Sequence, residues 1–163
     1  MDRNDFSNPE SRMGIYKSIS EVPDRYQLSV HTSKYEGRDV WEEYLEENFD
    51  ADRLSEWREY VLSKADRYWK AHMSEVGRHH ALAQPRDIEK WCSQLLENCS
   101  LRTLYEHYWI QIEQFYSWLQ YHTNHPHAYN PVLMAAVTEP VSQQIWEEKI
   151  SHGRNRSTKG RSR

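Results

Sequence analysis

Large apolar side chains recur at the spacing of an α-helix between residues 38 and 151, and this recurrence constrains the fold more than any other feature. Its clearest stretch places Tyr108, Ile112, Phe115 and Leu119 on one stripe. Side chains three and four positions apart lie on the same face of a helix, so this stripe predicts a long helix central to a bundle. The same spacing over the whole region predicts an all-α fold of about five or six helices.

A second apolar stripe runs through residues 52–75, where Trp57, Tyr68 and His72 share one face of the predicted helix. Aromatic residues at helical spacing usually pack between helices, so we expect these rings in the core. A shorter helix with an acidic outer face is predicted before it, over residues 38–48.

Residues with capping and breaking tendencies mark the helix boundaries. Gly77 predicts the end of the helix over 52–75, and Pro85 is suited to the first position of the next helix. Thr103 and Glu106 have the spacing of a capping box, which predicts that Thr103 caps the long helix.

Two further helix starts follow a loop rich in histidine. Asn130 before Pro131 combines a capping residue with a proline at the first helical position. Pro140 can begin a last helix, which Gly153 is expected to end.

The segments on either side of the helical region lack its periodicity. Residues 1–37 predict an irregular arm, in which 22–32 could form a short strand. Residues 38–151 predict one helical domain, and residues 152–163 predict a basic, disordered tail.

Charge is distributed unevenly along the chain. Residues 36–50 contain seven acidic side chains and one basic side chain, Arg38. The segment from Ser151 onward contains no acid and five bases, namely Arg154, Arg156, Lys159, Arg161 and Arg163. A basic segment on a protein with a net charge of -4 suits contact with phosphate groups, so these five side chains are candidates for DNA binding. The alternative is a solvated end that binds nothing.

The cysteines and the absence of long apolar runs predict a cytoplasmic protein. Cys92 and Cys99 would lie roughly 10 Å apart on one helix, which is too far for a disulfide. No stretch approaches the length of a membrane-spanning helix, and the first residues lack the apolar core of a signal peptide.

The histidines invite a metal site, because His122, His125 and His127 fall in one loop. Zinc sites normally add cysteine or carboxylate ligands at fixed spacing, and the chain contains neither a CxxC nor an HExxH motif. It also lacks the glycine-rich phosphate-binding motifs and the GxSxG motif of hydrolases. We therefore expect no metal, no cofactor and no catalytic residue.

Three motifs follow one another over about half of the chain. They are the segment PRDIEKWCSQLLEN, the segment SLRTLYEHYWIQIEQFYSWLQ, and the Asn130-Pro131 step that opens a short helix. In this order they make the stretch from Trp57 to Val137 resemble the N-terminal core-binding domain of tyrosine recombinases, the phage integrases. The segment HTNHPHAYNPVLMAA is especially similar to integrases of halophilic archaea and their mobile elements.

This resemblance implies a SAM-like four-helix bundle that clamps one side of a recombination site on double-stranded DNA. In the family a separate C-terminal domain performs strand exchange with a tyrosine nucleophile. Only 26 residues follow Val137 here, and they contain no tyrosine. The resemblance therefore implies a DNA-binding chain that is not itself catalytic.

The resemblance also implies which side chains of the helical domain contact DNA. Arg102 and Thr103 would meet a phosphate at the start of the long helix. The other candidates are Arg86, Lys90, His107, Gln111 and Gln114. For Thr103 the alternative is a purely capping role, with Arg102 solvated.

Three functional hypotheses remain from the sequence. The first is a DNA-binding accessory to site-specific recombination or to integration of a mobile element. The second is a protein-binding module that docks on or regulates a full-length tyrosine recombinase through the acidic surface of residues 36–50. The third is the N-terminal remnant of a split integrase, whose catalytic half would be encoded by the next gene.

Overall fold

The computed structural model describes residues 8–12, 14 and 16–161, and within these residues it contains no strand. Its helices are α1 (Thr32–Tyr35), α2 (Val40–Asn48), α3 (Glu56–Val76), α4 (Pro85–Leu96), α5 (Leu101–Thr103), α6 (Ile110–Tyr121), α7 (Pro131–Thr138) and α8 (Pro140–Arg161). A π-helical segment, Leu104–Trp109, joins α5 to α6 without a break. The predicted all-α fold is confirmed, whereas the SAM-like arrangement stays a prediction.

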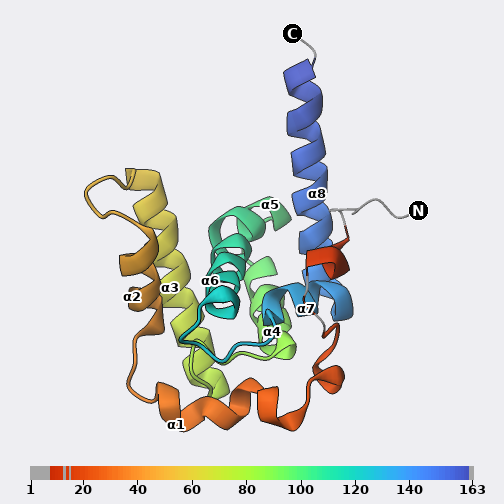
Figure 1. Cartoon of the computed structure of the whole chain (residues 1–163). Coiled ribbons are helices and arrows are strands. Elements are labelled where there is room, and N and C mark those ends of the chain that lie inside the picture. The colour runs from red at the N-terminus through yellow and green to blue at the C-terminus, as the bar shows by residue number, and fades with distance from the viewer. Residues whose placement is uncertain (1–7, 13, 15, 162–163) are drawn as a thin grey trace.

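Helix α6 lies in the middle of the bundle (Figure 1), with α2 and α3 on one side and α7 and α8 on the other. Its side chains Ile112, Phe115, Tyr116 and Leu119 are all buried. The central position follows from this composition, because a helix that is apolar over most of its circumference must be covered by other helices.

Most of the predicted helix boundaries are confirmed. Gly77 ends α3 in the left-handed conformation, with φ of 84°, and Pro85 is the first residue of α4. The Asn130 carboxamide oxygen accepts a hydrogen bond from the Val132 N–H at 2.9 Å, which caps α7. Pro140 begins α8.

The predicted capping role of Thr103 is wrong. The helix begins one turn earlier, because the Ser100 hydroxyl accepts a hydrogen bond from the Thr103 N–H at 3.2 Å. Both serine and threonine favour the capping position, and Ser100 comes first in the chain. Thr103 is therefore the last residue of α5 rather than the cap.

The predicted end of the last helix at Gly153 is also wrong. Helix α8 continues to Arg161, and Figure 1 shows its C-terminal part extending beyond the other helices. A single glycine inside a helix costs only about 1 kcal/mol relative to alanine, so it does not by itself terminate a helix. The expected disordered tail over 152–163 is thus helical as far as Arg161.

The N-terminal arm contains short 3-10 helices, namely Pro9–Arg12, Ile19–Glu21, Asp24–Tyr26 and Leu28–His31. The last two occupy the segment 22–32, where the sequence allowed a strand. Figure 1 shows that the arm passes along one end of the bundle. Val22, Leu28 and Tyr35 are buried there, so the arm is part of the packed structure.

Tryptophan and tyrosine side chains dominate the core. Trp41, Trp69 and Trp109 are almost completely buried, and the ring centroids of Trp69 and Trp91 lie 4.9 Å apart at a steep angle. Burying a large apolar side chain stabilises a fold by roughly 1.5–3 kcal/mol. Rings of this size, packed edge to face, hold the helices together.

The loop between α3 and α4 is held by polar atoms of these same core side chains. The His80 carbonyl oxygen accepts hydrogen bonds from the Trp69 indole N–H at 2.9 Å and from the Tyr116 hydroxyl at 2.8 Å. The Tyr116 oxygen in turn accepts from the Ala83 N–H at 2.9 Å. The sequence analysis did not anticipate these links between core and loop.

Two simpler predictions concern cysteines and membranes. Cys92 and Cys99 are both free, as predicted, although α4 ends at Leu96 and the two cysteines therefore do not share one helix. Among the described residues, no helix has both the length and the apolar character that crossing a bilayer would require.

Candidate nucleic-acid interface

One side of α3 presents aromatic and basic side chains together on the surface. Trp57, Tyr60 and Tyr68 have exposed fractions of 56%, 51% and 43%. Lys64 and Arg67 alternate with them at helical spacing, so all five lie on the same face. We call these five residues the α3 face.

The aromatic rings and the cations of the α3 face contact one another. The Lys64 ammonium lies 5.3 Å from the ring centroid of Tyr60 and 5.0 Å from that of Tyr108. The Arg67 guanidinium lies 5.4 Å from the ring of Tyr68. Contacts of this kind hold long basic side chains against the surface while their charge remains accessible to solvent.

Lys64 remains a cation in this setting. Partial burial acts to lower the pKa of Lys64, but hydrogen bonds with Tyr108 and Tyr60 outweigh it, so the pKa is raised. The face therefore carries a fixed positive charge near neutral pH.

His107, a predicted DNA-contacting residue, adjoins the α3 face. Its Nδ1 accepts a hydrogen bond from the Lys64 ammonium at 3.2 Å, and its ring packs edge-on against Trp57 with centroids 5.0 Å apart. Burial, and next the charge of Lys64, lower the pKa of His107. The ring is therefore neutral and serves as an extension of the aromatic surface.

Thr103 lies next to the same face, and Arg102 precedes it in α5. Thr103 lines a groove together with Lys64 and Tyr68 of α3. Its hydroxyl accepts a hydrogen bond from the Ser100 hydroxyl at 3.1 Å. The Arg102 side chain is well exposed and forms an ion pair with Glu106 at 3.2 Å. Such an exposed pair contributes little to stability, so the arginine can exchange its partner at low cost.

The remaining predicted residues, which are Gln111, Gln114, Arg86 and Lys90, differ in exposure. Gln111 is only 2% exposed and donates a hydrogen bond to the Glu106 carbonyl at 3.1 Å, so its assignment to DNA contact is wrong. Gln114 is exposed on α6. Arg86 and Lys90 are exposed on α4, and Arg86 lines a separate hollow formed with the arm and α7.

The basic residues of the last segment lie outside the residues whose side chains are described: Arg154, Arg156, Lys159, Arg161 and Arg163. For Arg154 to Arg161, only the backbone of α8 is placed. Their contact with DNA stays a prediction.

A groove of about 670 Å³ lies beside the α3 face, between α3 and α4. Trp91 and Tyr108, which are nearly buried, form its floor together with His72. Tyr68 and Lys64 stand on the α3 side of the groove. A volume of this size lies in the range of small-molecule sites, which extends over about 300–1,000 Å³.

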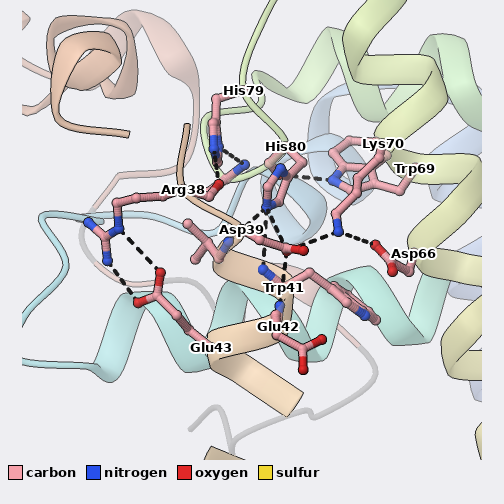
Figure 2. Close-up of polar contacts among 12 residues, drawn as sticks. Arg38, Asp39, Trp41, Glu42, Glu43, Asp66, Trp69, Lys70, His79 and His80 are labelled. Carbon is pink, nitrogen blue, oxygen red and sulfur yellow. Dashed lines mark hydrogen bonds and ion pairs between the residues drawn. The ribbon is translucent and has the colours of Figure 1, made fainter. Parts of the chain in front are cut away.

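The histidines of the loop 77–84 form hydrogen bonds with backbone groups, and among the described residues they are not grouped to bind a metal ion. Figure 2 shows His80 at the start of α2, where its Nε2 accepts hydrogen bonds from the Val40 N–H at 3.1 Å and the Trp41 N–H at 3.3 Å. The Asp39 carboxylate accepts from the Glu42 N–H in the same turn. The two side chains accept hydrogen bonds from N–H groups at the start of α2 that have no partner within the helix.

The histidines of the loop 122–130 are similarly engaged. His127 donates through Nε2 to the Ala81 carbonyl at 2.6 Å, and the Nδ1 of His125 is hydrogen-bonded to the Tyr35 hydroxyl at 2.6 Å. In the part of the chain that the structure describes, no three histidine, cysteine or carboxylate side chains are grouped to hold a metal ion.

Burial keeps two of these histidines neutral. It lowers the pKa of His80 to about 3, with a further contribution from His79, and lowers the pKa of His127 to about 3. An unprotonated Nε2 on His80 is also what its acceptor role requires.

The acidic segment 36–50 is partly neutralised by internal pairs. Arg38 forms a two-pronged ion pair with Glu43, and Lys70 bridges Asp39 and Asp66 (Figure 2). The outward-facing glutamates of α2, Glu42 and Glu46, remain exposed.

Comparison with known proteins adds no relative. No protein-family model matches the chain, and neither a curated protein nor a solved structure matches it.

The helical spacing of Trp57 and Tyr68 predicts that both rings lie in the core, so the α3 face is not predicted from the sequence. Both rings are exposed, so that expectation is wrong. The available signal was the alternation of these rings with Lys64 and Arg67, since a face buried in a core would not carry two cations.

Proposed function

We propose that the protein binds double-stranded DNA through the α3 face, with Arg102, Thr103 and His107 at its edge. In this role it acts without catalysis, as an accessory to site-specific recombination or to integration of a mobile element. The observation that carries the proposal is the exposed alternation of three aromatic rings with two cations on one side of α3.

The chemistry of the α3 face suits a nucleic-acid backbone. Lys64 and Arg67 can neutralise phosphates, and the hydroxyls of Tyr60 and Tyr68 can donate hydrogen bonds to phosphate oxygens. Soluble proteins seldom group large exposed rings without a binding partner. An aromatic surface with fixed cations favours a partner that has both anionic groups and planar rings.

The recombination context rests on the resemblance of Trp57–Val137 to integrase core-binding domains. The α3 face lies at the start of that stretch, and the basic sequence 154–163 lies beyond its end. A projecting α8 with four basic residues along its last turns is a second element suited to phosphates.

Binding of the full chain to duplex DNA tests the proposal. Fluorescence anisotropy with attachment-site-like DNA and with random DNA, over a range of salt, gives both affinity and specificity. The double variant Lys64→Gln/Arg67→Gln should weaken binding and reduce the slope of log affinity against log salt by about 2. Lys34→Gln, an exposed lysine on α1, is the matched control and should change neither quantity. Absence of binding to any duplex at low salt would overturn the proposal.

A protein-binding role is the second candidate, and the exposed glutamates of α2 favour it. Glu42 and Glu46 could meet a basic surface on a full-length tyrosine recombinase. Charge reversal of both glutamates to lysine should abolish such docking, whereas DNA binding should persist and should not weaken, because the change only adds positive charge.

A further inference from the structure

The floor of the groove between α3 and α4 includes a buried histidine that the fold holds in place. His72 lines this groove and is 5% exposed. Its Nε2 donates a hydrogen bond to the Asp87 carbonyl oxygen at 2.8 Å, because a carbonyl only accepts. This bond fixes the ring as part of the groove floor.

The groove offers hydrogen-bond donors and acceptors on its α4 side, where Gln94 and Asn98 line it and are exposed. A carboxamide both donates and accepts, so these two residues suit the polar edge of a planar ligand.

The α3 side and the floor of the groove are aromatic. The half-exposed ring of Tyr68 packs against Tyr108 with centroids 5.7 Å apart, and Tyr108 packs against Trp91 at the same separation. Lys64 stands beside them with its ammonium over Tyr108. The ring of Tyr68 can therefore stack on a planar ligand, and Gln94 and Asn98 can form hydrogen bonds with the edge of that ligand. The Lys64 ammonium can bind a phosphate attached to it.

The backbone beside the groove is irregular as well. Tyr108 belongs to the π-helical segment Leu104–Trp109, and Thr103 directly precedes that segment. Single-turn π-helical segments occur frequently at functional sites, because the widened turn re-aims its side chains.

We propose that this groove binds one unpaired nucleobase of a DNA strand, stacked on Tyr68 and hydrogen-bonded by Gln94 and Asn98. The inference rests on the proposed DNA binding and deepens it: the protein would prefer DNA that is locally opened, such as a bulge or a strand junction, over a fully paired duplex.

Three DNA probes test the preference with the full chain. They are a paired duplex, the same duplex with one unpaired adenine, and the same duplex with an abasic residue in place of that adenine. The unpaired adenine should bind about tenfold more tightly than the paired duplex, since stacking one base on an aromatic side chain accounts for roughly that factor. The abasic probe should lose this gain. A 2-aminopurine in the unpaired position should lose fluorescence on binding, because stacking quenches it.

A variant that fills the groove separates this site from the α3 face. Gln94→Trp places a large ring in the groove at an exposed position, so the affinity for the unpaired adenine should fall to that for the paired duplex. Ser93→Trp, at the neighbouring exposed position outside the groove, is the matched control and should keep the preference. Circular dichroism of both variants verifies folding.

The outcomes distinguish the two proposals. Duplex binding with equal affinity for all three probes would overturn the groove site alone. A preference that survives in Gln94→Trp would also overturn it. If the protein binds none of the three probes at low salt, the proposed DNA binding is overturned, and the groove site with it.

Discussion

The imidazole of His80 caps the helix that begins at Val40, with Nε2 accepting the Val40 N–H at 3.1 Å from a loop forty residues away in sequence. Helix caps are usually supplied by the residue just before the helix, and here Asp39 supplies only part of the cap, to Glu42. The start of α2 therefore depends on the loop that follows α3, and on a ring that must be unprotonated.

Stability is expected to fall on acidification. The folded-state pKa values of His80 and His127, each about 3, lie below the ordinary value of 6.5. The unfolded chain therefore takes up more protons as the pH falls through 6.5, and the free energy of unfolding decreases from there toward pH 3. Each histidine contributes at most about 1.4 kcal/mol per pH unit in this window. Urea denaturation at a series of pH values measures this, and a flat profile between pH 7 and 5 would contradict it.

Replacing the capping ring should weaken both stability and its pH dependence. His80→Ala leaves the N–H groups of Val40 and Trp41 without their acceptor, so the free energy of unfolding should fall by about 1–2 kcal/mol at pH 7. Between pH 7 and 5 the free energy of unfolding of this variant should decrease less than that of the unmodified protein, because one buried histidine is gone. Equal pH profiles for the two proteins would argue against the capping role.

Asn130 is expected to be one of the most sensitive polar positions. Its oxygen caps α7, and its amide nitrogen donates to the Glu113 carbonyl and the Ser117 hydroxyl of α6. Asn130→Ala removes these bonds in a buried setting and should lower the free energy of unfolding by about 2–4 kcal/mol. Asn124→Ala, at an exposed asparagine of the preceding loop, should change it by less than about 0.5 kcal/mol. Thermal denaturation of the two variants gives the comparison.

Exposed tyrosines offer a matched pair for the DNA-binding surface. Tyr60→Ala on the α3 face should weaken duplex binding about fivefold or more, by the loss of a ring contact and a hydroxyl donor. Tyr121→Ala, at a ring that is 78% exposed at the end of α6, should leave binding unchanged. Neither variant should alter the melting temperature appreciably, because the Tyr121 ring is largely exposed and the Tyr60 ring is half-exposed. Equal affinities would exclude the α3 face as the contact surface.

Removing residues 154–163 separates the two candidate functions. The truncation deletes five basic side chains, so DNA affinity should fall and its salt dependence should become shallower. Docking on a recombinase through α2 should be unaffected. Pull-down with a full-length tyrosine recombinase and anisotropy with DNA, carried out on the same truncated chain, give the two readouts.

The helices themselves were largely predictable from local signals. Gly77, Pro85 and Asn130 each act through backbone geometry or a hydrogen bond within one turn, and each lies where those local rules put it. Where two residues compete for one role, the local rule is not sufficient. Ser100 and Thr103 both suit a cap, and only the folded chain shows that the helix begins at the earlier one.

The surface was much less predictable than the helices. A stripe such as Trp57, Tyr60 and Tyr68 has the periodicity of a buried face, and periodicity alone does not say whether another helix covers it. The α6 stripe is covered and the α3 face is not, because the packing partners come from distant parts of the chain. The hydrogen bond by which His80 caps α2 could not be predicted for the same reason, because His80 lies forty residues away in sequence.

The way core side chains hold the loop after α3 has a consequence for how the protein opens. Trp69 and Tyr116 sit in the packed interior, yet their polar atoms bind the His80 carbonyl, and Tyr116 also accepts the Ala83 N–H. The loop cannot separate from the bundle unless these rings also leave their places. We therefore expect the Ala83 amide to exchange its hydrogen with solvent as slowly as the most protected amides of α6, although it belongs to a loop. Loop and core would unfold as one cooperative unit.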